Sequence, residues 1–151
     1  LPQGDQTLRK LRLRRFRKPV TGRRKTGGSK REAAVRDILR SLTPGVAWNS
    51  IRPAWLMGEH GRRLEIDCYA PQLGKRGIAV EVSGEHHYNA RYVGEEEYRK
   101  QCRRDALKRR MLAERGVAVI VVPYHVEDWH LDAFLSIELG KHLNAGRRKV
   151  S

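Results

Sequence analysis

"GIAVEVSGEHHYNARY", residues 77–92, has the pattern of a buried strand that runs into a polar loop. Ile78, Val80 and Val82 recur at every second position, and β-branched residues in such runs are typical of strands inside a sheet. Glu81 interrupts this apolar pattern. Because burying an unpaired carboxylate is costly, we expect a cation, a metal ion or a hydrogen-bond donor beside it.

The neighbouring elements extend this strand into a sheet. "RLEIDCYA" predicts a strand with Leu64, Ile66 and Cys68 on one face and Asp67 on the other, and the turn "PQLGKRG" predicts a hairpin with the Glu81 strand. A helix is expected from Ser29 to Leu42, and a strand interrupted at Pro53 within "VAWNSIRPAWLM". Residues 94–116 predict a helix of about 21 residues, followed by a central parallel strand, "VAVIVV". A last amphipathic helix would bury Trp129, Leu131, Phe134, Leu135, Leu139 and Leu143. The expected fold is α/β, in the order α-β-β-β-α-β-α.

Composition narrows the class of protein. The chain has 151 residues, which suits one domain, and a net charge of +15, which favours nucleic acid over an anionic membrane surface as partner. No run of eighteen apolar residues is present, so we expect no membrane span. The two cysteines lack CxxC spacing, which argues against a zinc site or a disulfide framework and fits an intracellular, reducing compartment.

Most of the charge lies at the start of the sequence. Residues 1–31 hold twelve Lys or Arg against one acid, a net charge of +11. We expect residues 1–28 to form a flexible basic arm that orders on a polyanion, residues 29–145 to form the domain, and residues 146–151 a basic tail. A solubilising tail or an organelle-targeting segment are the alternatives for the arm. The expected phosphate contacts of the arm are Arg12, Arg14, Arg15, Arg17, Lys18, Arg23, Arg24 and Lys25.

The carboxylates of the predicted hairpin suggest a metal site. Asp67 and Glu81 lie on neighbouring strands, where facing β-carbons are about 5 Å apart. A divalent cation would relieve their repulsion, and an all-oxygen site favours Mg²⁺, or Mn²⁺, over softer metals. The alternative is that one of the two acids pairs with an arginine. The two are expected to bind the metal directly.

The long helix and the histidines add further polar groups. Asp105 falls inside the expected apolar face of the helix, formed by Tyr98, Cys102, Ala106, Leu112 and Ala113. Either it pairs with Arg109, or the helix and strands converge on one polar pocket. His86 and His87 follow the Glu81 strand, and a neutral imidazole can take a proton from water. Adjacent residues of an extended chain point opposite ways, so one of the two is expected to face the site.

"LEIDCYA", "AVEVSGEHHY", "RDALKRR" and "VAVIVVPY" together resemble the PD-(D/E)XK restriction-endonuclease-like superfamily. The resemblance is best to the branch of very-short-patch repair and EDxHD homing endonucleases, and covers residues 29 to about 125. It implies an αβββαβ core with a mixed central sheet, and a metal-dependent endonuclease acting on DNA more than RNA. The site residues it implies are Glu32, Asp67, Glu81, His87 and Asp105. His87 is chosen over His86 because members often have Gln-His-Tyr here.

One departure from that superfamily concerns its strand lysine, whose place is taken by Ser83. In the EDxHD branch the lysine is absent and the histidine moves the proton, and Lys108 could supply the charge from the helix. Lys108 and Arg104 are expected to offset charge on the phosphate. Glu32 has a second role open to it, a capping box with Ser29. A double-strand cut would need two sites, which leaves a homodimer or larger nucleoprotein complex open.

RAP domains of organellar RNA-binding proteins share part of the same pattern, and "VPYHVEDW" fits them loosely. That resemblance implies a catalytically inactive RNA-binding protein, for instance in an organellar ribosome or processing complex. The set of Asp67, Glu81, His87 and Asp105 favours the nuclease, because a pure binder has no need of carboxylates that repel phosphate.

Overall fold

The computed structural model describes residues 30–84 and 94–147 of the chain. Within these ranges the elements follow in the order α2 (Lys30–Leu42), β1 (Asn49–Ile51), η1 (Glu59–Gly61), β2 (Ile66–Ala70), β3 (Ile78–Val82), α4 (Glu95–Glu114), β4 (Ala118–Val122), η3 (Asp128–His130) and α5 (Leu131–Arg147). The predicted α/β class and order of helices and strands are confirmed. The predicted arm at 1–28, Ser29, both loop histidines and residues 148–151 lie outside the described part.

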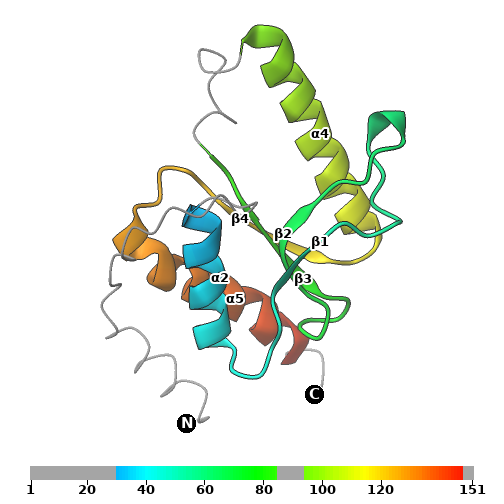
Figure 1. The fold of residues 1–151 in the computed structure, drawn as a ribbon. Helices are drawn as coiled ribbons and strands as arrows, with labels where there is room; N and C mark the ends of the chain where they lie inside the picture. Colours follow the sequence, from blue (N-terminus) through cyan, green and yellow to red (C-terminus); the bar gives the residue numbers. More distant parts are fainter. Residues whose placement is uncertain (1–29, 85–93, 148–151) are drawn as a thin grey trace.

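The strands form one mixed sheet in the order β1-β2-β3-β4 (Figure 1). β2 and β3 are the predicted antiparallel hairpin, with Cys68 facing Val80, and β3 pairs in parallel with β4 from Ile78 to Val82. The parallel pairing of β4 is therefore confirmed. Its central position was wrong, because among the described strands β4 pairs with β3 alone and lies at the edge.

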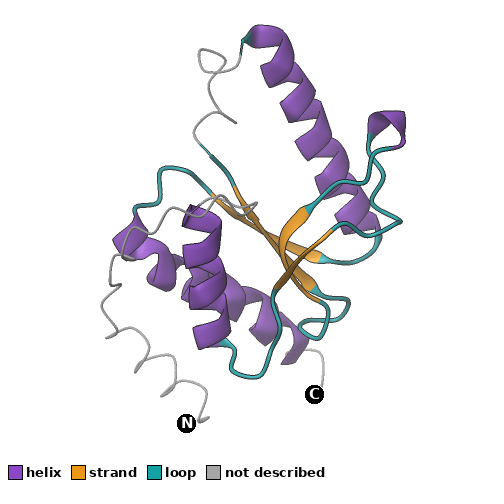
Figure 2. Cartoon of the chain, in the orientation of Figure 1, coloured by secondary structure: helices purple, strands orange, loops and turns teal. Residues whose placement is uncertain are grey.

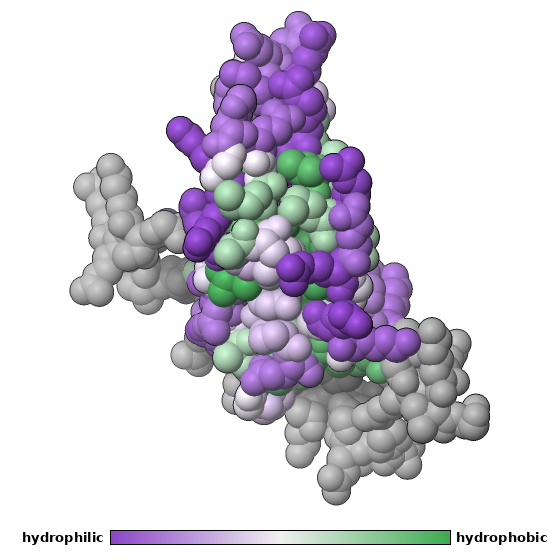
Figure 3. All heavy atoms as spheres, turned by 90° about the vertical axis from the view of Figure 1, so that its right-hand side faces the viewer, coloured by the Kyte–Doolittle hydropathy of each residue, from purple (hydrophilic) through white to green (hydrophobic). Residues whose placement is uncertain are grey.

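Helices cover the two faces of the sheet unequally (Figure 2). α2 and α5 pack on one face and bury Val35, Leu39, Leu131 and Leu135 against Trp48 and the inward side chains of the strands. On the opposite face a smaller cluster gathers around Leu112 of α4. Viewed from that side, hydrophobic side chains form a strip between hydrophilic areas (Figure 3). No helix within residues 30–84 and 94–147 is long and apolar enough to cross a membrane.

A β-bulge in β2 changes which way its side chains point. Asn49 of β1 pairs with Tyr69, but Ile51 pairs with Ile66, so three steps along β2 face two along β1. The extra residue lies at Asp67–Cys68, and such bulges re-aim the side chains around them. As a result Ile66 packs in the smaller cluster, while Cys68 packs in the main core. The predicted common face of Leu64, Ile66 and Cys68 was therefore wrong.

The inward side of α4 also differs from the prediction. Of the five residues expected to form its apolar face, Leu112 alone is buried, and Cys102, Ala106 and Ala113 are exposed. The side turned toward the protein instead carries Asp105 and Lys108 above Leu112, because it lies against a polar cavity for part of its length. The side chains of Cys102, Ala106 and Ala113 consequently face solvent.

The end of the chain differs from the prediction in two further respects. Trp129, expected on the apolar face of the last helix, precedes α5 and is 66% exposed, whereas Leu131, Leu135 and Leu139 are buried as predicted. α5 continues to Arg147, so the predicted tail at 146–151 begins inside the helix.

Candidate functional site

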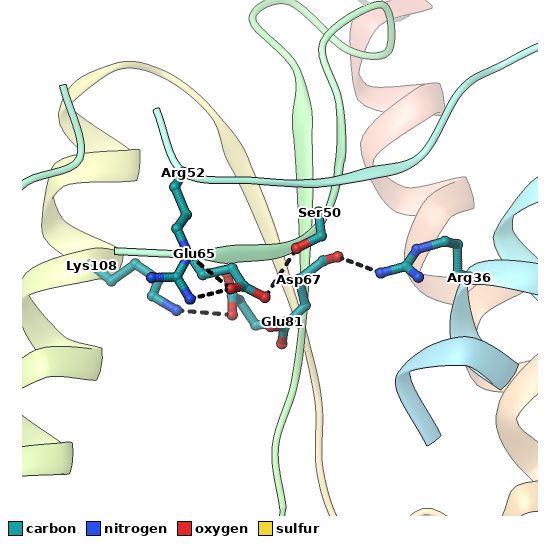
Figure 4. A network of polar contacts seen from close by, with 7 residues as sticks. All are labelled: Arg36, Ser50, Arg52, Glu65, Asp67, Glu81 and Lys108. Carbon is teal, nitrogen blue, oxygen red and sulfur yellow. Dashed lines mark hydrogen bonds and ion pairs between the residues drawn. The ribbon is translucent and has the colours of Figure 1, made fainter. Parts of the chain in front are cut away.

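Asp67 is held in place by the neighbouring strand and by α2. Its Oδ2 accepts a hydrogen bond of 2.8 Å from the backbone N–H of Val82, and its backbone carbonyl accepts one of 3.1 Å from Arg36 of α2. Continuing the β2–β3 pairing by one residue places Asp67 opposite Glu81. The bulge and these two hydrogen bonds therefore fix one carboxylate beside the other (Figure 4).

Glu81 is paired with a cation from the other side of the sheet. Lys108 of α4 donates a hydrogen bond of 3.1 Å to its Oε2 (Figure 4). The other oxygen, Oε1, is buried and has no hydrogen-bond partner among the described residues. The cation beside Glu81 is thus a lysine rather than the arginine that the sequence left open, and one carboxylate oxygen still has capacity to accept.

Burial governs the protonation of this carboxyl group. It raises the pKa of Glu81 from 4.5 to about 8, against the lowering effect of Lys108 and with a further raising effect of the Asp67 charge. Desolvation disfavours the charged form, and a neighbouring like charge acts in the same direction. Near neutral pH the Glu81 carboxyl group therefore tends to hold a proton, which a divalent cation could replace.

One polar cavity brings the predicted acids together. Its volume is about 120 Å³, and it opens at the ends of β3 and β4 where both strands turn into loops. The residues that line it are Glu32, Asp67, Glu81, Val82, Ser83, Asp105, Lys108, Arg109 and Val121. Five of the six predicted catalytic residues, the four acids and Lys108, are on this list. The convergence of helix and strands on one polar pocket is therefore present, and α2 contributes Glu32 to it.

Other predicted site residues lie elsewhere. Arg104 is exposed on α4 and does not line the cavity. His87 and the eight basic residues of the arm fall outside the described ranges, as does Ser29, the capping partner expected for Glu32. Both members of the alternative Asp105–Arg109 pair line the cavity.

Sequence reasoning missed Arg36. It stands four residues after Glu32, which places both side chains on the same side of α2. This spacing was the available signal, but the target of Arg36 is a backbone carbonyl, which no residue type reveals. A second network was also missed: Arg52 and Ser50 both donate to the carboxylate of Glu65, at 2.7 and 3.0 Å (Figure 4). This network is exposed and lies outside the cavity lining.

Cys68, next to Asp67, is buried and inert. Burial raises the pKa of its thiol to about 12, with the nearby Arg36 guanidinium acting in the opposite direction. The thiolate is the reactive form of cysteine, so this group stays neutral and is no nucleophile at ordinary pH. Cys68 and Cys102 are both free cysteines.

The donor set fits a hard divalent cation held with the help of substrate. Among the residues that the structure describes, no cluster of three or more His, Cys, Asp or Glu has the arrangement of a complete metal site. Mg²⁺ is commonly held by one or two carboxylates together with water and substrate phosphates. Asp67 and the unpartnered Oε1 of Glu81 meet that smaller requirement.

The chain is similar to three viral proteins. It is 37% identical over 127 residues to uncharacterized protein 033L of Invertebrate iridescent virus 3, covering 80% of this chain and 63% of that protein. It is 38% identical over 105 residues to uncharacterized protein 094L of Frog virus 3 (isolate Goorha), covering 66% and 65%. Uncharacterized protein 307L of Invertebrate iridescent virus 6 is 40% identical over 90 residues, covering 54% and 44%. The chain thus spans less than two thirds of each relative. No family model and no solved structure matches it.

Proposed function

We propose that this protein is a metal-dependent endonuclease built on a restriction-endonuclease-like core, with DNA favoured over RNA as substrate. The observation that carries the proposal is the single cavity in which Glu32, Asp67, Glu81, Asp105 and Lys108 meet. Four acids gathered with Lys108 and Arg109 around one cavity have no role in a hydrophobic core. They match the chemistry of phosphodiester hydrolysis, which needs a cation for the phosphate and a base for the water.

Asp67 and Glu81 are the residues that would hold Mg²⁺ or Mn²⁺. When bound, such an ion polarises the scissile phosphate and stabilises the charge on the leaving oxygen. The protein's own contribution is to keep the two carboxylates in place before substrate arrives. The Val82 N–H and the Arg36 guanidinium do this for Asp67, and Lys108 does it for Glu81.

Lys108, Asp105 and His87 have complementary roles in this proposal. Lys108 carries its ammonium group inside the cavity, where it can donate to a phosphate oxygen as negative charge develops. His87 accepts the proton of the attacking water, and Asp105 orients that water or the imidazole. Arg104 lies one helical turn before Lys108 and exposed, so it suits contact with a phosphate outside the cavity.

A second candidate is a nucleic-acid-binding protein without catalysis. The observation that favours it is the Lys108–Glu81 ion pair, in which a buried lysine compensates the carboxylate. A fold without nuclease activity could retain such a pair, because the lysine compensates a carboxylate that is already buried. The basic arm would serve either protein equally well.

The two candidates differ in one assay. The full chain is incubated with supercoiled plasmid DNA and with structured RNA, in Mg²⁺, in Mn²⁺ and in EDTA. We expect nicked or linear DNA with either metal and intact DNA in EDTA. Binding of the same DNA with no cleavage in either metal would remove the nuclease and leave the second candidate.

A further inference from the structure

The segment between β4 and α5 displays four aromatic rings to solvent. Tyr124 is 42% exposed and Trp129 66%. Tyr124 and His125 meet edge to face with ring centroids 5.6 Å apart, and Trp129 lies over His130 with centroids 3.4 Å apart. The core at this point is supplied by Leu131 and Leu135 instead. These rings are therefore not needed to bury apolar surface.

The same segment is held rigidly. Arg31 of α2 donates to the carbonyls of Pro123 and Val126, at 2.7 and 2.6 Å, and to the carboxylate of Asp128 at 3.1 Å. The indole N–H of Trp129 donates to the Glu127 carboxylate. Flat surfaces fixed before a ligand arrives lose little conformational entropy on binding.

The segment also borders the cavity. The N–H of Ser83, which lines the cavity, donates a 3.0 Å hydrogen bond to the carbonyl of Val122, the last residue of β4. Arg31, which clamps the segment, directly precedes the cavity residue Glu32. In Figure 1 the orange chain after β4 lies beside the blue start of α2. The segment is thus connected to the cavity at two points, by the Ser83–Val122 hydrogen bond and by the chain from Arg31 to Glu32. A ligand bound on the rings would extend from there toward the cavity carboxylates.

The charges in the segment define what it can bind. Glu127 and Asp128 would repel the phosphates of a duplex laid across it, and both already accept hydrogen bonds from within the protein. An uncharged nucleobase has a flat face that stacks on exposed aromatic rings without needing a cation. The basic arm, residues 1–28 with a net charge of +9, precedes α2 in the sequence and can supply cations for the nucleic-acid backbone.

We propose that Tyr124–His130 is a stacking platform for unpaired nucleobases. This inference rests on the proposed nuclease function and deepens it. The substrate class becomes nucleic acid with unpaired nucleotides beside the scissile phosphate, as in single strands, flaps and junctions. Trp129 is the main stacking surface because it is the most exposed of the large hydrophobic side chains of the described chain.

The test measures binding apart from catalysis. The full chain is titrated in EDTA with a fluorescent oligothymidylate and, separately, with a hairpin duplex of the same length. Trp129→Ala should weaken oligothymidylate binding about tenfold, within the range of one lost base–aromatic stack, and leave duplex binding nearly unchanged. Trp129→Phe keeps an aromatic face and should retain most of the affinity. Ile137→Ala is the matched control, since it trims another exposed apolar side chain, 53% exposed, outside the segment.

Each result decides the proposal. A selective loss of oligothymidylate binding in Trp129→Ala, with binding retained in Trp129→Phe, supports the platform. This conclusion holds even if the protein cleaves no nucleic acid. In that case only the proposed nuclease function fails. Equal loss on both ligands, or loss in Trp129→Ala no greater than in Ile137→Ala, overturns the platform while plasmid cleavage can still stand. Lower thermal stability of Trp129→Ala with unchanged oligothymidylate binding also overturns it, because the ring then packs on another part of the chain.

Discussion

Lys108 Nζ lies 3.1 Å from Glu81 Oε2, and the two side chains are 14% and 15% exposed. This pair joins α4 to β3 across the edge of the cavity. A buried pair of this kind adds little net stability, but removing one partner leaves a buried group without compensation. The pair therefore holds α4 in the position that brings Asp105 to the cavity. Burial at this position raises the pKa of the Glu81 carboxyl group to about 8.

The raised pKa of Glu81 predicts how stability changes with pH in metal-free protein. Between pH 4.5 and about 8 the folded state keeps a proton that the unfolded state releases. Stability should therefore fall as pH rises through this window, by at most about 1.4 kcal/mol per pH unit. Urea unfolding in EDTA at several pH values measures it. In the double variant Glu81→Gln, Lys108→Met this part of the slope should vanish. Parallel curves for both proteins would contradict the assignment.

Asp67→Asn should abolish cleavage while nucleic-acid binding persists or tightens. The change removes a metal ligand and one negative charge from the cavity together, but keeps an oxygen for the Val82 N–H. Plasmid cleavage and oligonucleotide binding are measured on the same preparation. Glu65→Gln is the matched control, because Glu65 lies two residues away but is held by Arg52 outside the cavity. Normal turnover in Asp67→Asn would disprove the proposed site.

Arg31→Ala should destabilise the folded domain by about 2 kcal/mol, since it leaves two carbonyls and Asp128 without their charged donor. Urea unfolding measures the change. Arg40→Ala on the same helix is the control, because its pair with Asp37 is exposed and 3.9 Å long. That control should cost no more than about 0.5 kcal/mol. Equal effects of the two changes would mean that Arg31 does not clamp the segment after β4.

The order of elements could be predicted because each has a local signal. The apolar spacing of α2, the alternation and turn of the β2–β3 hairpin, and the β-branched run of β4 are patterns within one segment. The bulge at Asp67–Cys68 has no such signal, because it arises from pairing with β1. The edge position of β4 likewise depends on which strands pair. The apolar, β-branched sequence of β4 therefore led to the wrong prediction of a central strand.

The acids of the cavity could be predicted because charged residues in apolar patterns are conspicuous. Glu81 and Asp105 each interrupt such a pattern, and Asp67 lies on the strand predicted to pair with that of Glu81. Asp105 was placed correctly for a partly wrong reason, since the side of α4 that carries it is polar rather than apolar. Trp129 shows the converse: hydrophobic residues predict burial on average, but the chain around Trp129 leaves it in solvent.

His87→Ala should slow cleavage about 10²-fold or more, as expected for loss of a general base. His86→Ala should cost much less if the two side chains point opposite ways in the loop after β3. The rates are compared under saturating DNA, so that binding differences do not contribute. A larger effect at His86 would shift the assignment by one residue. No effect at either would favour the second candidate, the binding protein.

The arm should supply most of the non-specific affinity, because residues 1–28 carry +9 of the total charge of +15. If it neutralises on the order of six phosphates, the slope of log K against log salt should be about −4 to −5. Deleting residues 1–28 should flatten that slope and weaken binding at moderate salt. The deletion ends before α2, so the folded domain should remain intact.

Chemistry at saturating substrate should change little in the truncated protein, because the cavity is lined by residues of the folded domain. Circular dichroism and urea unfolding check that the domain is unaffected. If deleting residues 1–28 removes most of the salt dependence, the arm holds the nucleic-acid backbone, and the cavity then acts on one phosphate. Parallel slopes for the two proteins would instead place the phosphate contacts on the folded domain, where Arg104 is one of the exposed cations of α4. The arm would then serve targeting or a protein partner.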